Sequence, residues 1–154
     1  MIIVLRDRLR RHYDSKYEQT SVDPSNVPPC ETPGSVSIPT NRFDAAVSFC
    51  SRLFAGESIL EIGAGNGGVA VGLLQSGISF SHYRATEASP VRLHALRQRL
   101  DDPRFSVSLF DIEDQNGRSD EKYDMIILVA VIEHLIDPIS ALASLRECLK
   151  PGGF

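Results

Sequence analysis

Cysteine is scarce in this sequence. Cys30, Cys50 and Cys148 lie far apart, and none of them forms the CxxC or Cys–His spacing of a metal site. Disulfides are rare in the cytosol, so we expect three reduced thiols in a cytoplasmic protein. Long apolar runs are lacking as well. The opening run from Met1 to Leu5 is too short for the core of a signal peptide, and no stretch is long enough to cross a membrane.

A marked excess of charge is also missing. The formal net charge is -4, with 16 Lys and Arg against 20 Asp and Glu. Proteins that bind nucleic acid or acidic membranes through general electrostatic attraction usually have a strongly basic balance, so neither partner is indicated. The other totals are ordinary for one soluble domain: 154 residues, 42% apolar and 23% charged.

The chain divides near residue 40. From Ile2 to Tyr13, apolar and aromatic side chains recur at a spacing that fits one face of a helix. Residues 20–40 are rich in proline, serine and threonine, which is typical of an extended linker. We therefore expect an N-terminal helix or arm and a Pro-rich linker over residues 1–40, and a folded domain over residues 41–154.

Strands and helices are expected to alternate through the second part. The apolar pattern predicts strands at 58–62, 81–87, 105–110 and 123–131, and helices at 42–54, 67–75, 90–100 and 138–149. The buried face of the last helix is expected to contain Ile139, Leu142, Leu145 and Leu149. Strands that alternate with helices of about a dozen residues imply a mostly parallel sheet with helices on both faces, an α/β three-layer sandwich.

The segment from Glu61 to Gly68 carries the most information. A strand leads directly into closely spaced glycines and then into a helix, which lets backbone approach a ligand where a side chain would block it. Gly63, Gly65 and Gly68 also have the GxGxxG spacing of dinucleotide-binding proteins. The turn alone is therefore ambiguous.

Two carboxylates stand at the ends of later strands. Glu87 ends the second strand, where a carboxylate can accept hydrogen bonds from both ribose hydroxyls. The alternative for Glu87 is a solvated carboxylate at a strand end without a ligand. Asp111 ends the third strand, where it could accept a bond from an adenine amino group while Ile112 packs on the ring. The alternative for Asp111 is a residue that only forms a turn.

In this order, the motifs resemble the class I S-adenosylmethionine-dependent methyltransferase family. The family motif (D/E)xGxGxG is matched by Glu61 to Gly67, its second-strand acid by Glu87 and its adenine-side acid by Asp111. Its fourth-strand segment matches residues 123–135, and its LKPGG turn before the fifth strand matches residues 149–153. The resemblance implies a Rossmann-like sheet in the order 3-2-1-4, whose later strands are missing or have just begun.

The resemblance also implies a set of contacts with S-adenosylmethionine. The methionine part is approached by Gly63, Ala64 and Gly65, and its amino group is ordered by Glu61. The ribose is held by Glu87, with Ala88 beside it, and the adenine by Asp111 and Ile112. The floor near the sulfonium is lined by Val129 and Ala130.

Three further residues each allow two interpretations. Arg42 resembles the arginine with which some of these enzymes clamp the cofactor carboxylate, or it is a surface arginine in the first turn of a helix. His134 or Glu133 is the candidate general base, or His134 orients the loop after the fourth strand. Some relatives hold a metal with a Glu-x-x-Glu-His segment, but Ala130 replaces the first acid here, so we expect no metal.

The resemblance implies an enzyme that transfers a methyl group to an acceptor that the sequence does not identify, with a small molecule favoured. If the last strands are absent, the apolar fourth strand is an exposed edge. We therefore hypothesise a truncated chain, or half of an assembly, that self-associates through this edge. Two alternatives stay open: a cofactor-binding fragment without turnover, and a nucleotide-dependent dehydrogenase domain.

Overall fold

The computed structural model describes residues 11, 15, 41–114 and 120–154. The predicted arm and linker over residues 1–40 therefore lie outside the described residues, apart from Arg11 and Ser15, and so does Cys30.

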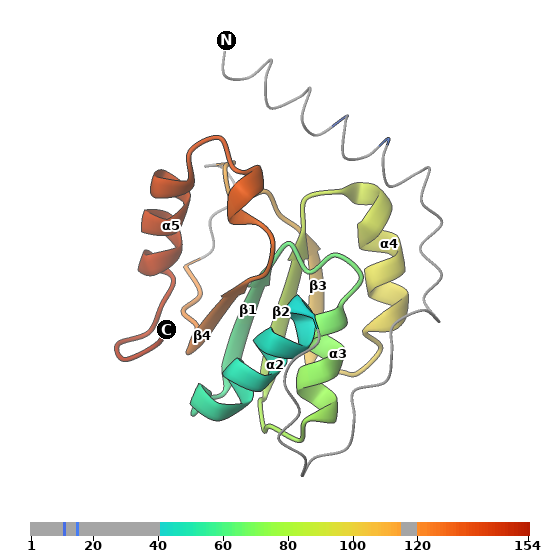
Figure 1. Cartoon of the computed structure of the whole chain (residues 1–154), viewed down its shortest axis with the longest axis vertical. Helices are drawn as coiled ribbons and strands as arrows, with labels where there is room; N and C mark the ends of the chain where they lie inside the picture. Colours follow the sequence, from blue (N-terminus) through green and yellow to red (C-terminus); the bar gives the residue numbers. More distant parts are fainter. Residues whose placement is uncertain (1–10, 12–14, 16–40, 115–119) are drawn as a thin grey trace.

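The described part contains the predicted alternation of strands and helices. The elements are α2 (Arg42–Leu53), β1 (Ser58–Ile62), α3 (Gly68–Gln75), β2 (His82–Glu87), α4 (Pro90–Arg99), β3 (Phe105–Leu109), β4 (Met125–Leu128), the short 3-10 helix η3 (Ile132–His134) and α5 (Pro138–Glu147). The strands are parallel and lie in the predicted order β3-β2-β1-β4 (Figure 1). Asn41 begins α2 as a cap, because its side-chain oxygen accepts hydrogen bonds from the amides of Phe43 and Asp44 at 2.9 and 3.0 Å.

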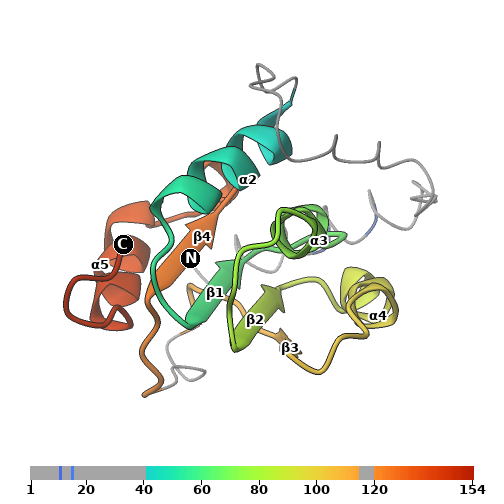
Figure 2. The ribbon, with the colours of Figure 1, turned by 90° about the horizontal axis from the view of Figure 1, so that it is seen from below.

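Helices cover both faces of this sheet, which confirms the three-layer architecture. Figure 2 shows α2, α3 and α4 over one face and α5 over the other. Because side chains alternate along a strand, Ile59 and Glu61 of β1 face the first layer, and Leu60 and Ile62 face α5. This alternation places an acid in an apolar layer, directly before the glycines.

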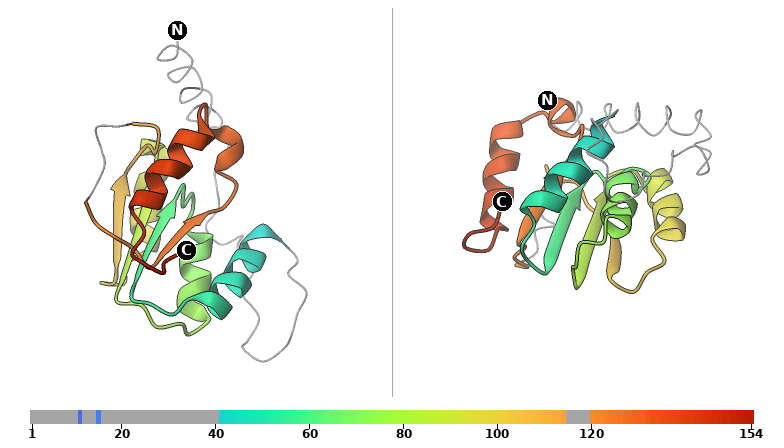
Figure 3. Two further views of the ribbon diagram at one scale, coloured as in Figure 1. Left: turned by 90° about the vertical axis from the view of Figure 1, so that its left-hand side faces the viewer. Right: turned by 60° about the horizontal axis from the view of Figure 1, so that its bottom comes forward.

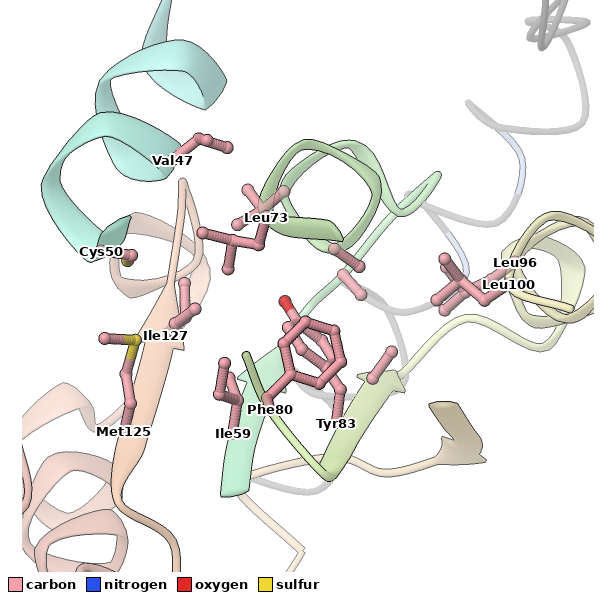
Figure 4. Packing of buried hydrophobic residues seen from close by; sticks show 14 residues of the cluster. Val47, Cys50, Ile59, Leu73, Phe80, Tyr83, Leu96, Leu100, Met125 and Ile127 are labelled. Carbon is pink, nitrogen blue, oxygen red and sulfur yellow. The ribbon is translucent and has the colours of Figure 1, made fainter. Parts of the chain in front are cut away.

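The larger core lies between the sheet and the three helices on its first face. Figure 4 shows Val47 and Cys50 of α2 and Leu73 of α3 directed toward Ile127 and Ile59 of the strands. Aromatic rings fill the side nearer to β3, where Tyr83, Phe80 and Phe105 pack with ring centroids 5.2 to 5.6 Å apart. The core thus fixes β1 and β2, whose ends lead into the glycine turn and carry Glu61 and Glu87.

Two predictions about the last part of the chain are wrong. The strand expected over 123–131 is shorter, since β4 ends at Leu128 and Ala130 takes a left-handed φ of 56°. The buried face of α5 is rotated from the predicted one: Ile139 is 80% exposed and Leu142 is 41% exposed. The helix packs through Ala141, Leu145 and Cys148 instead, an i, i+4, i+7 stripe that shares Leu145 with the predicted one. Figure 3 shows α5 on the opposite side of β4 from α2.

The end of the chain pairs with the outer side of β4. The Phe154 amide donates to the Asp124 carbonyl at 3.1 Å, and the Ile126 amide donates to the Phe154 carbonyl at 2.9 Å. This is the hydrogen-bond pattern of a parallel ladder, so Phe154 pairs with the outer side of β4 as a neighbouring parallel strand would. Among the described residues, no helix combines the length and the apolar character needed to span a bilayer.

Candidate functional site

The glycine turn after β1 has a backbone that few other residues could adopt. Gly63, Gly65 and Gly67 have φ values of 68°, 58° and 77°, in the left-handed region that favours glycine. A Cβ atom on Gly63 would lie 2.7 Å from Cγ2 of Val131, so the chain after β4 approaches the turn closely. The Ala64 amide donates to the carbonyl of Thr86 at 2.8 Å, which fastens the turn to the end of β2.

Glu87 joins the glycine turn to the start of α4. Its Oε2 accepts a hydrogen bond from the Gly65 amide at 2.9 Å, and its Oε1 accepts one from the Ser89 amide at 3.0 Å. Its side chain is buried, with 7% of the residue exposed, and Ala88 beside it is half-buried. Each carboxylate oxygen has a second lone pair, so both can accept a further bond from a ligand.

Glu61 lies beneath the turn and is almost sealed from solvent. It is 2% exposed, and its Oε2 accepts a hydrogen bond from the Tyr83 hydroxyl at 2.8 Å. Burial raises the pKa of Glu61 from 4.5 to about 7; the Tyr83 bond opposes this rise, and the charge of Glu87 adds to it. Burial and the neighbouring Glu61 also raise the pKa of the Cys50 thiol and of Tyr83.

Asp111 follows β3 in a tight turn. Its Oδ1 accepts a hydrogen bond from the Glu113 amide at 3.0 Å, and its carbonyl accepts one from the Asp114 amide at 2.9 Å. The turn-forming role is therefore real, and it leaves a ligand-binding role open, since a carboxylate has further acceptor sites. The Phe110 amide donates to the carbonyl of Glu87 at 3.0 Å, which joins this turn to the acid at the end of β2. Ile112 is half-buried and packs against the core on the α5 face.

The chain after β4 approaches the glycine turn that follows β1. Val129 packs against the core on the first face, and Ala130 follows with its left-handed backbone. A non-glycine residue in this region is held there by its surroundings at some cost in free energy. Glu133 and His134 are exposed residues of η3. No group of three or more His, Cys, Asp or Glu residues within the described part of the chain could hold a metal ion.

Arg42 begins α2 and is exposed, with its guanidinium 5.0 Å from the centre of the Phe43 ring. The Phe43 ring in turn lies near the glycine turn, because a Cβ atom on Gly68 would be 3.7 Å from it. The first turn of α2 thus stands beside the start of α3. Arg42 is therefore near the start of α3, and its role as a carboxylate clamp stays a prediction.

The structure brings most of the predicted site residues to one edge of the sheet. Parallel strands place their carboxyl ends together, so the residues after β1, β2, β3 and β4 are neighbours there. The sequence did not single out three residues that support the groups at this edge through hydrogen bonds. Tyr83 and Thr86 of β2 donate their hydroxyls to the side chain and the carbonyl of Glu61, and Glu113 binds the chain before α5. Their partners are more than 20 positions away in sequence, so no local spacing indicates them.

Comparison with known proteins identifies the group to which this architecture belongs. The family profile described as a methyltransferase domain matches residues 60–154. The ubiquinone biosynthesis O-methyltransferase of Vibrio vulnificus is 28% identical over 114 residues, which are 73% of this chain and 47% of that protein. The chain thus spans about half the length of this relative.

Solved structures agree with the sequence match. The glycopeptide N-methyltransferase MtfA, solved with S-adenosyl-L-homocysteine, is 26% identical and superposes with a TM-score of 0.61 over 80% of this chain and 50% of that one. Coclaurine N-methyltransferase shares the fold at 20% identity, with a TM-score of 0.62 over 85% of this chain and 40% of that one. The profile match covers more than half of the residues and includes the glycine turn, Glu87 and Asp111. This chain belongs to the class I S-adenosylmethionine-dependent methyltransferase family, with its Rossmann-like fold.

Proposed function

We propose that this chain binds S-adenosylmethionine at the carboxyl edge of its sheet and directs the methyl group to a small-molecule acceptor. The observation that carries the proposal is the hydrogen bond of 2.9 Å from the Gly65 amide to Glu87. It joins the two motif elements that the family uses for one ligand, a side-chain-free turn and a strand-end acid. Family membership supports this reading over the dehydrogenase alternative.

Each residue at the edge suits one part of that ligand. Gly63, Ala64 and Gly65 offer backbone to the methionine part, and Glu87 offers carboxylate lone pairs to the ribose hydroxyls. Asp111, with Ile112, is assigned to the adenine.

The buried acid has a different role in this proposal. Because Glu61 is 2% exposed, we assign it an electrostatic attraction for the ammonium group from beneath the turn. A buried carboxylate becomes easier to ionise when a cation binds next to it. Glu61 therefore favours a ligand with a positive charge at this point.

When bound, S-adenosylmethionine supplies an electrophilic methyl group on a sulfonium, so the protein mainly has to orient the acceptor and exclude water. Val129 and Ala130 are assigned to the floor beside the reacting centre. His134 or Glu133 is assigned as the base for acceptors that must lose a proton, and their exposure on η3 leaves them accessible to an acceptor.

The names of the relatives favour a small acceptor. One acts in ubiquinone biosynthesis, and coclaurine N-methyltransferase was solved with N-methylheliamine. A cytoplasmic location, expected from the sequence, belongs to the same proposal.

Calorimetry with S-adenosylmethionine, S-adenosylhomocysteine and NADH tests the binding step. We expect the first two to bind and NADH not to bind. Glu87→Gln should weaken binding by about tenfold or more, since a hydrogen bond to a charged group contributes about 1.5 to 3 kcal/mol. Glu147→Gln, at the exposed end of α5, is the matched control and should bind as the wild type does.

Transfer is then measured with methyl-labelled cofactor and a panel of small alcohols, phenols and amines. Binding without transfer to any acceptor would favour the fragment without turnover. Binding of NADH alone would overturn the proposal and revive the dehydrogenase reading.

A further inference from the structure

The segment between β4 and α5 is held by a carboxylate from a distant part of the chain. Oε1 of Glu113 accepts hydrogen bonds from the amides of Ile136 and Asp137, both at 2.8 Å. These amides lie 23 and 24 positions after Glu113 in the sequence. Two bonds to one ionised oxygen make a stronger tether than an ordinary neutral contact.

Glu113 belongs to the same turn as the acid assigned to the adenine. Its own amide donates to Oδ1 of Asp111 at 3.0 Å, so the Asp111 carboxylate holds the backbone of Glu113. The side chain of Glu113 in turn holds the segment before α5. Glu113 therefore connects Asp111, through its amide, to the residues just before α5, through its side chain.

The tethered segment is also restrained at its other end. It begins at Ala130, with its left-handed backbone, and continues with Val131, whose methyl group fills the space that a side chain on Gly63 would need. Between these restraints lie Glu133 and His134, the two exposed candidates for a base. The segment 130–137 is thus clamped between the glycine turn and the turn after β3.

We propose that Glu113 is a positioning residue that couples occupation of the cofactor site to the conformation of residues 130–137. The inference rests on the proposed binding of S-adenosylmethionine. A ligand that orders the Asp111 turn also orders the Glu113 carboxylate, and through it the segment that carries Glu133 and His134. Coupling is reciprocal, so a segment released from Glu113 weakens the binding of the ligand.

A purely local role would be capping of α5, because its N-terminal amides attract negative charge. Asp137 already fills that role: its carboxylate accepts hydrogen bonds from the amide and the hydroxyl of Ser140 at 3.0 and 2.7 Å. Asp137→Ala therefore removes a cap from the same helix end and leaves the backbone bonds to Glu113 intact. It is a matched control for loss of stability at this place.

The test is the affinity of S-adenosylhomocysteine for the wild type, Glu113→Ala, Glu113→Gln and Asp137→Ala, measured by calorimetry. We expect Glu113→Ala to bind about tenfold more weakly and Asp137→Ala to stay within about twofold of the wild type, because coupling between sites is typically about 5- to 150-fold. Glu113→Gln keeps an acceptor oxygen and should regain most of the affinity. Equal losses in Glu113→Ala and Asp137→Ala, or no loss in Glu113→Ala, would overturn the coupling.

Hydrogen exchange in the wild type gives a second readout that needs no variant to fold. Addition of S-adenosylhomocysteine should slow exchange of the amides of Ile136 and Asp137, while the Ser76 amide at the far end of α3 should not change. Unchanged exchange at 136 and 137 in protein that has bound the ligand refutes this inference and leaves the proposed function standing. Failure of the wild type to bind the ligand refutes both.

Discussion

Replacement of Glu61 by glutamine tests the electrostatic cost of the acid beneath the glycine turn. Burial raises the pKa of Glu61 from 4.5 to about 7 in the folded protein. Between these two values the folded state holds a proton that the unfolded chain has lost. The stability that this group contributes is therefore fully present below the unfolded value of 4.5 and is lost as the pH rises through about 7.

The size of the effect follows from the shift. One pKa unit corresponds to about 1.4 kcal/mol, so a rise from 4.5 to about 7 corresponds to about 3 kcal/mol at high pH. Glutamine cannot ionise, and its amide oxygen can still accept the hydrogen bond from Tyr83. The stability of Glu61→Gln relative to the wild type should therefore increase by about 2 to 3 kcal/mol between about pH 5 and about pH 8.

Urea unfolding followed by circular dichroism measures this difference, since the chain has no tryptophan to serve as a fluorescent probe. Effects of other titrating groups cancel when the two proteins are compared at each pH. Tyr83→Phe removes the bond that lowers the pKa of Glu61, so its transition should move to higher pH. A stability difference between Glu61→Gln and the wild type that does not change with pH would refute the reasoning.

Three more predictions concern other parts of the fold. Asp124→Ala should cost about 3 kcal/mol in urea unfolding, because Oδ2 accepts bonds from two amides, a serine hydroxyl and the Lys150 ammonium. Lys150 and these donors lower the pKa of Asp124 in the folded protein. The stability that Asp124 contributes is therefore present above its ordinary pKa and is lost as the pH falls from there through the lowered pKa. Gly63→Ala should lose more stability than Gly77→Ala, since both have a left-handed φ but only the first would collide with a neighbour, and equal losses would contradict the contact. Ile139→Asp should cost less than about 0.5 kcal/mol in urea unfolding, because Ile139 is 80% exposed, and a cost typical of a buried position would contradict its placement on the solvent side of α5.

The fold could be predicted because its signals are local. Asn41 and Asp137 cap helices, Pro90 and Pro138 occupy first turns, and apolar runs mark the strands. The errors arose where local signals overlap. The apolar run continues past Leu128, but the backbone turns there because the following segment packs against the glycine turn.

The same explanation holds for α5, where two apolar stripes are compatible with one sequence. Only contact with the sheet decides which stripe is buried, so Ala141 and Leu145 face inward and Ile139 faces solvent. Periodicity predicts that a helix has a buried face and leaves its direction within a turn open.

The site divides in a similar way. Gly63, Glu87 and Asp111 could be singled out because they stand at the ends of successive strands in the order of the family motifs, and the structure joins their segments by hydrogen bonds. Tyr83 and Glu113 could not be found, since each acts on a partner brought near only by the sheet. The assignment of each residue to a part of the ligand stays a prediction.

The two edges of the sheet differ in how their groups contribute to the free energy of folding, and this difference points to the carboxyl edge without reference to any motif. At the amino edge, Asp124 receives four hydrogen bonds and joins the start of β1 to the end of the chain. At the carboxyl edge, Glu61 is buried with one donor from Tyr83, and Ala130 holds a left-handed backbone. Groups that cost folding free energy persist where their surroundings hold them for another purpose, and they are typical of functional sites. The buried acid is costly in the free protein, and a bound ammonium group would remove that cost. Under the proposed function, we therefore expect the edge that carries the glycine turn to favour a cationic ligand.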